Sequence, residues 1–178
     1  EGERFKVGTI DIEGDTILPK ATLMPGLKIT REPFFNREAV RKDILWLTDL
    51  HANAGFANAD VSPRTQEDPV NHLVNITYSV TKGEKVYFET IDISGNVRTR
   101  DKVIRRELRI HEREVYSSAR LKRSVRNLHR LDFFEDVKVD TVEGSAKDKM
   151  NVKVDLVEKA TGTFTFGAGY SIGSVILR

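Results

Sequence analysis

The sequence predicts an α+β fold of two tandem domains of one kind, each a three-stranded β-sheet with two helices on one face. Three observations predict it: an internal repeat, the same order of hydrophobic patterns in both copies, and a proline in one predicted strand. The chain has 178 residues, enough for two small domains with modest cores.

The repeat relates residues 2–14 to residues 83–95, a separation of 81 positions. Seven of the thirteen aligned pairs are identical, including an Ile-Asp-Ile sequence in both copies. Unrelated segments would match at about one position in fifteen. A period of this length suits a small domain and not a solenoid turn, so we expect one domain at residues 1–82 and another at 83–162.

Each copy begins with alternating apolar residues that end at a glycine, which predicts a strand followed by a turn. Thr99 is then expected to cap a helix in the second copy. In the first copy, Pro19 and Pro25 should limit the corresponding helix to a short segment, because proline disrupts a helix interior. The apolar residues of the two strands and of the helix are Phe5, Val7, Ile10, Ile12, then Val86, Phe88, Ile91, Ile93, then Val103, Ile104, Leu108.

A second helix is predicted in each copy, with Asn36 and Ser117 as N-caps. An apolar stripe with helical spacing follows each cap, and the two stripes are again 81 residues apart. Their members are Val40, Ile44, Leu47, Leu50 and Leu121, Val125, Leu128, Leu131.

Two alternating runs after each helix predict a β-hairpin. Pro63 lies in the first of these runs, and proline is confined to the edges or bulges of a sheet. We therefore expect this strand and its counterpart, Asp136–Val142, to be edge strands.

Beyond Gly162 the pattern changes. Residues 163–172 alternate apolar residues with small or polar ones and carry no charge. Since this suits a strand between lipid and a barrel lumen, we expect residues 163–178 to begin a membrane barrel strand.

Composition and motifs give little support for catalysis. The chain has no cysteine, which excludes thiol catalysis and Cys-based zinc sites, and no segment is apolar and long enough for a membrane helix. The four histidines, His51, His72, His111 and His129, lack metal-ligand spacing, so we expect them on the solvated surface. We predict no enzyme activity, no cofactor and no metal site.

The strongest local signal is electrostatic. Residues 98–130 hold 12 Lys/Arg and four Asp/Glu, a net formal charge of +8, although the whole chain carries only +2. Such a segment is either a solvated helix face or a surface for nucleic acid, anionic headgroups or an acidic partner. Nucleic acid is disfavoured because no aromatic residues for base stacking are interspersed with the charges.

The second copy resembles a POTRA domain, and the chain resembles the last two POTRA domains of a BamA-type outer-membrane protein assembly factor. The residues that carry the resemblance are Ile91-Asp92-Ile93-Ser94-Gly95-Asn96, Arg105-Arg106-Glu107-Leu108, Tyr116 and Leu128–Val137. The sequence departs from the family at Asp132, where glycine is usual, and at 111–114, where the family has a glycine-containing turn. Asp132 tolerates left-handed backbone geometry better than most residues do.

The resemblance implies that the chain is the periplasmic part of an assembly factor, which is attached to the outer membrane of a Gram-negative bacterium through a C-terminal barrel. It also implies that this part binds unfolded outer-membrane proteins by strand addition and docks BamD-like lipoproteins. We expect strand addition at Asp136, Val137, Lys138, Val139, Asp140, Thr141 and Val142, and lipoprotein docking at Arg109 and Glu112. Proline at Lys138 or Asp140 is expected to weaken strand addition with little loss of fold, because these side chains point away from Val137 and Val139. No nucleic-acid partner is expected.

Two alternatives remain open from the sequence. One is the POTRA region of a two-partner secretion or translocation pore, which carries two such domains before its barrel. The other is an RNA-binding or headgroup-binding module that uses the basic surface of residues 98–130. Salt-dependent binding to mixed RNA would distinguish the second alternative.

Overall fold

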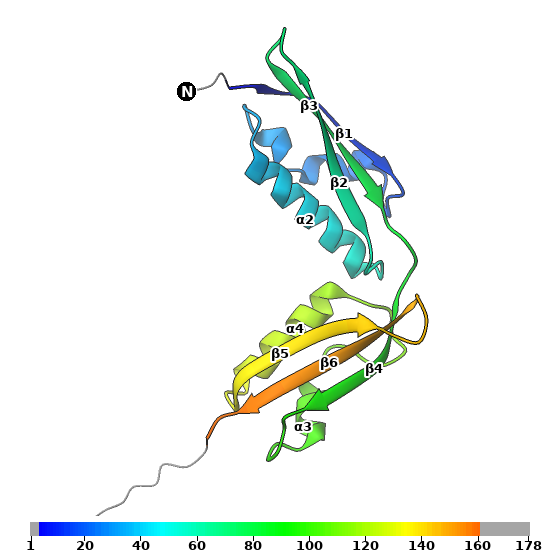
Figure 1. The fold of residues 1–178 in the computed structure, drawn as a ribbon, viewed down its shortest axis with the longest axis vertical. Coiled ribbons are helices and arrows are strands. Elements are labelled where there is room, and N and C mark those ends of the chain that lie inside the picture. Colours follow the sequence, from blue (N-terminus) through cyan, green and yellow to red (C-terminus); the bar gives the residue numbers. More distant parts are fainter. Residues whose placement is uncertain (1–3, 161–178) are drawn as a thin grey trace, which may run out of the picture.

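The computed structural model describes residues 4–160, which form two domains in sequence (Figure 1). The first contains β1 (Lys6–Gly14), α1 (Lys20–Leu23), the 3-10 helices η1 (Met24–Gly26) and η2 (Ile29–Arg31), α2 (Arg37–Asn53), β2 (Asp60–Asp68) and β3 (Leu73–Thr81). The second contains β4 (Tyr87–Ser94), α3 (Asp101–Glu107), α4 (Ser118–Arg130), β5 (Phe134–Glu143) and β6 (Lys149–Glu158). The residues of the expected barrel strand, 163–178, lie outside the described part.

Each domain has a three-stranded sheet in which the last strand is central. The strand orders are β1-β3-β2 and β4-β6-β5. The first strand of each domain pairs in parallel with the central strand, and the hairpin partner pairs antiparallel with it. β2 and β5 are therefore edge strands, which confirms the prediction made from Pro63.

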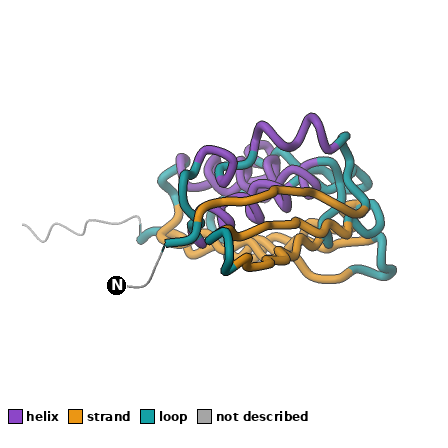
Figure 2. The backbone as a smooth tube through the Cα atoms, turned by 90° about the horizontal axis from the view of Figure 1, so that it is seen from above, coloured by secondary structure: helices purple, strands orange, loops and turns teal. Residues whose placement is uncertain are grey.

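Helices cover one face of the sheets, and the strands form the other layer (Figure 2). The predicted apolar stripes of α2 and α4 pack into the two cores. Ile76 and Tyr78 on β3, and Val152 and Val154 on β6, are almost completely buried because both strands are central. The predicted fold, two β-α-α-β-β domains, is confirmed.

Two of the three predicted N-cap residues are observed as N-caps in the structure, and one is not. The side chain of Asn36 accepts hydrogen bonds from the backbone of Glu38 and Ala39, and that of Ser117 accepts one from Arg120. Thr99 does not cap α3, so that prediction was wrong. Its hydroxyl instead donates to the carboxylate of Glu158, as does its N–H at 2.7 Å, and the helix begins at Asp101 with Arg100 at the N-cap position.

Left-handed backbone positions explain one glycine of the repeat and both departures from the family pattern. At Gly14 (φ 96°), a Cβ would lie 2.2 Å from the carbonyl oxygen of Val80, so only glycine fits there. Asp132 has φ 56°, as expected for an aspartate that replaces glycine, and the 111–114 loop turns at Arg113 with φ 70°. The loop thus keeps a left-handed residue without using glycine.

One histidine prediction was wrong. His51 is completely buried in α2, whereas His72, His111 and His129 are exposed. Its Nδ1 donates to the Leu47 carbonyl oxygen at 2.7 Å, and its Nε2 accepts from the Ile17 N–H at 3.3 Å. Both ring nitrogens are therefore used within the first domain, which gives His51 a structural role.

Asp43 is a second buried polar residue on α2. Its carboxylate accepts from the N–H groups of Lys28 and Ile29, at 2.6 and 3.0 Å, and from the Tyr78 hydroxyl at 2.9 Å. Burial, and then the hydrogen bond to Asp43, raise the pKa of Tyr78. This cluster joins the 3-10 segment, α2 and β3 in one core.

The domains are joined by a short linker and also contact each other directly. The N–H of Val86 donates to the Gly55 carbonyl oxygen at 2.8 Å. Lys122 on α4 forms an ion pair with Asp49 on α2 at 2.8 Å. Among residues 4–160, no helix has the length and apolar character needed to cross a bilayer.

Candidate functional site

β5 presents an open hydrogen-bonding edge. The N–H of Gly144 donates to the Lys149 carbonyl oxygen at 2.9 Å, which fixes the direction of the ladder just beyond β5. In an antiparallel pair this direction alternates from residue to residue. Four N–H groups of β5 therefore point away from β6: those of Val137, Val139, Thr141 and Glu143. The N–H of Val137 donates to the Asp136 carboxylate at 2.9 Å.

The same alternation shows that proline at Lys138 or Asp140 is not a clean test of strand addition. Lys138 pairs with Asp155, and Asp140 pairs with Lys153, at positions whose N–H groups point toward β6. Proline at either position would remove a hydrogen bond of the sheet itself, so the expectation of little loss of fold was wrong. Thr141 is exposed and its N–H points outward, so it is the better position for blocking this edge.

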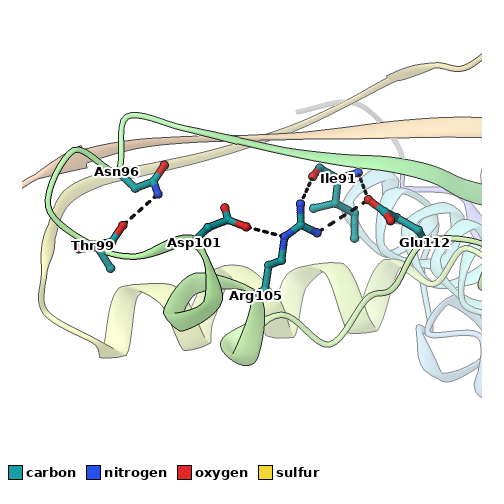
Figure 3. Close-up of polar contacts among 6 residues, drawn as sticks. All are labelled: Ile91, Asn96, Thr99, Asp101, Arg105 and Glu112. Carbon is teal, nitrogen blue, oxygen red and sulfur yellow. Dashed lines mark hydrogen bonds and ion pairs between the residues drawn. The ribbon is translucent and has the colours of Figure 1, made fainter.

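β4, the other edge of this sheet, is closed by its own domain. Near its start, the N–H of Phe88 donates to Glu114 and the N–H of Arg113 donates to Phe88, at 2.9 and 2.7 Å. Further along, the N–H of Ile91 donates to the Glu112 carboxylate at 3.2 Å, and the Ile91 carbonyl oxygen accepts from Arg105 at 3.0 Å (Figure 3). An added strand would have to displace these contacts.

Arg105 is the centre of this closure. Its Nε lies 2.7 Å from the Asp101 carboxylate, and its Nη1 lies 3.8 Å from that of Glu112 (Figure 3). Close by, the Asn96 amide donates to the Thr99 carbonyl oxygen at 2.9 Å and shapes the loop before α3. Neither Arg105 nor Asp101 is predicted from the sequence to have this role, although their i, i+4 spacing is a recognisable helix pair.

The first domain offers a weaker edge on the corresponding strand. Pro63 pairs with Tyr78, which is flanked on its other side by Ile12. Val139 occupies the same place in the second domain, because it pairs with Val154, which is flanked by Ile93. Pro63 therefore lacks the outward N–H that Val139 has.

The two residues expected to dock a lipoprotein have different surroundings. Glu112 is engaged with Ile91 and Arg105. Arg109 donates its backbone N–H to the Ser124 hydroxyl at 2.7 Å, while its side chain is exposed and forms no ion pair among residues 4–160. The structure does not pair Arg109 with Glu112.

A cavity of about 500 Å³ lies where the domains meet, beside the end of β5. Its lining includes Asn58 from the first domain, Tyr116 and Lys149 from the second, and the edge residues Thr141 and Val142. Within the described residues, no group of three or more His, Asp or Glu side chains could hold a metal ion. The arrangement suits non-covalent binding along a strand edge.

The comparison with protein families decides the classification. A family model described as POTRA, surface antigen variable number repeat, matches residues 5–83 and again residues 86–159. The chain belongs to the POTRA family. Both POTRA domains have the sheet topology described above, and the resemblance to BamA-type POTRA domains is shown by the comparisons below.

Two curated relatives match 96% of the chain. The outer membrane protein assembly factor BamA of Nitratidesulfovibrio vulgaris is 33% identical over 175 residues, and BamA of Neisseria meningitidis is 32% identical over 172 residues. The POTRA chain spans 22% of the length of each. A crystal structure of Haemophilus influenzae BamA POTRA3-5 shares the fold, with a TM-score of 0.77 and 23% identity over 89% of this chain and 63% of that one.

Proposed function

We propose that this chain is a periplasmic POTRA module of an outer-membrane protein assembly factor. It binds extended segments of unfolded outer-membrane proteins, which pair with β5 as an additional strand. The observation that carries the proposal is the contrast between the two edges of the second sheet. β5 has outward N–H groups at Val139, Thr141 and Glu143, whereas β4 is occupied by Glu112, Arg105 and the 113–114 backbone.

Strand addition suits a module that meets many different chains. The added segment pairs through its backbone, so the interaction depends little on its side chains. Lys138 and Asp140, which form an ion pair at 2.9 Å, place charge on the exposed face of β5. Charged side chains of this kind limit uncontrolled pairing between edges while leaving the backbone accessible.

Thr141 provides a matched test of strand addition. Thr141→Pro removes one outward N–H, whereas Thr141→Ala changes the same side chain and keeps the N–H. In an NMR titration with an alternating peptide from a barrel strand, we expect Thr141→Pro to weaken binding several-fold, by roughly the 1 kcal/mol of one hydrogen bond. Thr141→Ala should bind as the unchanged chain does.

Two outcomes would count against strand addition. One is equal binding by the proline and alanine variants. The other is a titration in which the amides of residues 136–143 do not move while those elsewhere do. Lys138→Pro serves as a fold control, since it should destabilise the second domain even without peptide.

We further propose that an accessory outer-membrane lipoprotein docks around Arg109 and Glu112. The side chain of Arg109 is exposed and has no ion-pair partner in the described part of the chain, which supports a direct contact. Glu112 supports it by holding the 111–114 loop in place. Arg109→Glu should leave the midpoint of thermal unfolding nearly unchanged and weaken co-purification with the lipoprotein. Lys153→Glu, on the exposed face of β6, is the control of equal charge, and equal loss in both variants would argue against docking at Arg109.

A further inference from the structure

The two layers of the second domain carry opposite charge. Residues 98–130, which include α3 and α4, have a net formal charge of +8, whereas the three strands hold three lysines and eight carboxylates. The strands therefore have a net formal charge of −5. The helices lie on one side of the sheet (Figure 2). Because the two layers differ in charge, the domain has a cationic face and an anionic face.

Much of the cationic face has no partner among the described residues. Among residues 4–160, seven exposed Lys/Arg side chains of this segment form neither an ion pair nor a hydrogen bond: Arg100, Lys102, Arg109, Arg113, Arg123, Arg126 and Arg130. Arg123, Arg126 and Arg130, here called the arginine stripe, have i, i+3 and i+7 spacing on α4, a helix with no acidic residue. Like charges at such spacings destabilise a helix.

The helix dipole explains only part of this pattern. A cation in the last turn of a helix, such as Arg130, interacts favourably with the dipole. Arg123 lies in mid-helix, and Lys102 lies in the first turn of α3, where the dipole disfavours a cation. Stability of the domain alone therefore does not account for the cationic face.

Exposed apolar side chains lie in the loops before α3 and after α4. Val97 is 90% exposed and Phe133 is 49% exposed. Both lie beside the end of β6, because Glu158 accepts from the N–H of Arg98 and the N–H of Lys159 donates to the Phe133 carbonyl oxygen at 2.9 Å. Cations next to exposed apolar side chains are typical of surfaces that bind the membrane–water interface.

We propose that the α3–α4 side of the second domain binds the phosphate headgroups of an anionic lipid bilayer, with Val97 and Phe133 entering the interface. The planar guanidinium of arginine matches phosphate oxygens in a two-point contact. A bilayer accounts for both observations at once: the unpaired cations spread over two helices, and the apolar side chains in the loops before α3 and after α4. This surface is separate from the β5 edge, so the proposal does not depend on strand addition.

Co-sedimentation with large unilamellar vesicles tests the proposal on the 178-residue chain. We expect binding to vesicles of phosphatidylglycerol and phosphatidylcholine that weakens as salt is added. Vesicles of phosphatidylcholine alone measure any contribution that does not depend on charge. Arg123→Gln/Arg126→Gln/Arg130→Gln should weaken binding to the anionic vesicles on the order of tenfold or more.

The matched control also removes three positive charges, but at positions outside the helices. Lys138→Gln/Lys147→Gln/Lys153→Gln changes three exposed lysines of β5, β6 and their connecting turn and should retain binding. Val97→Ser/Phe133→Ser should weaken binding by an amount that persists at high salt. Circular dichroism establishes that each variant is folded.

Three results would overturn the proposal. The first is no binding of the unchanged chain to anionic vesicles beyond that to phosphatidylcholine. The second is equal loss in the two triple variants, which would show an effect of net charge alone. The third is binding to poly-glutamate that is lost in the arginine-stripe variant, together with no binding to vesicles. That result would indicate that the surface binds an acidic protein.

Discussion

The side-chain oxygen of Asn53, at the end of α2, accepts a hydrogen bond from the N–H of Ala119 in the first turn of α4, at 2.7 Å. The Ser118 hydroxyl donates to the same oxygen at 2.7 Å. The N–H groups of a first helical turn have no partner within their helix. A residue of the first domain thus completes the N-terminus of a helix in the second, next to the local cap Ser117.

Removing the side chain of Asn53 should destabilise both the N-terminus of α4 and the contact between the two domains. We expect Asn53→Ala to lower the free energy of unfolding of the second domain by about 1 kcal/mol, as for other caps. Hydrogen exchange at Ala119 should also become faster. Asn58→Ala is the control, since Asn58 is exposed near the same junction. Unchanged exchange at Ala119 in the Asn53 variant would contradict this role.

The buried carboxylate of Asp43 should be among the most sensitive positions of the first domain. Asp43→Ala leaves buried donors on Ile29 and Tyr78 unsatisfied, so we expect a loss of about 3 kcal/mol in the free energy of unfolding. Tyr78→Phe removes one donor and leaves Asp43 two others, so its cost should be about 1 kcal/mol. Urea denaturation measures both, and a larger cost for Tyr78→Phe than for Asp43→Ala would exclude this account.

Glu158 should make the loop before α3 sensitive to acid. Its pKa lies below the ordinary value of 4.5, chiefly because it accepts a hydrogen bond from the Thr99 N–H and also because it accepts from Arg98. Since the folded-state pKa is lowered, the stabilisation is present above the unfolded-state value and is lost as pH falls through the folded-state value.

The measurement compares thermal unfolding of the unchanged chain and Glu158→Gln at pH 7 and at pH 3. We expect the variant to be less stable at pH 7 and the difference to shrink at pH 3. The Thr99 amide resonance should titrate in the unchanged chain alone. A stability difference independent of pH would show that the charge of Glu158 has no part in holding the loop.

The closed edge of β4 gives a further prediction. Glu112→Ala removes the acceptor of the Ile91 N–H and one partner of Arg105, so the Ile91 amide should exchange faster. Glu107→Ala, which removes an ion pair with Arg106, should leave that amide unchanged. If Ile91 remained equally protected in both variants, the carboxylate would not be what closes this edge.

Much of the fold could be predicted from the sequence because the relevant signals are local. The caps Asn36 and Ser117 are followed by apolar stripes with helical spacing, and Pro63 identifies an edge by chemistry that needs no tertiary information. Asp132 takes the left-handed geometry expected where the family has glycine.

The remaining features depend on partners far apart in the sequence. Thr99 follows the rule for a helix cap, but its hydroxyl and its N–H both donate to the carboxylate of Glu158, 59 residues away. Burial of His51 depends on Ile17, which reaches it from the turn after β1. The inward N–H groups of Lys138 and Asp140 follow from the register with β6, which side-chain alternation along β5 does not supply.

The parallel pairing of β4 with β6 has a mechanical consequence. The chain enters the second domain at the start of β4 and leaves it at the end of β6, and these two points lie at opposite ends of a parallel pair. Tension along the chain therefore loads the hydrogen bonds between the two strands together, in shear, whereas pulling apart the β5–β6 hairpin from its open end would break its bonds one after another. In single-molecule pulling, attachment at residues 85 and 160 should require a higher unfolding force than attachment at residues 134 and 158. The domain should therefore resist a pull applied between its two ends better than one applied across the β5–β6 hairpin.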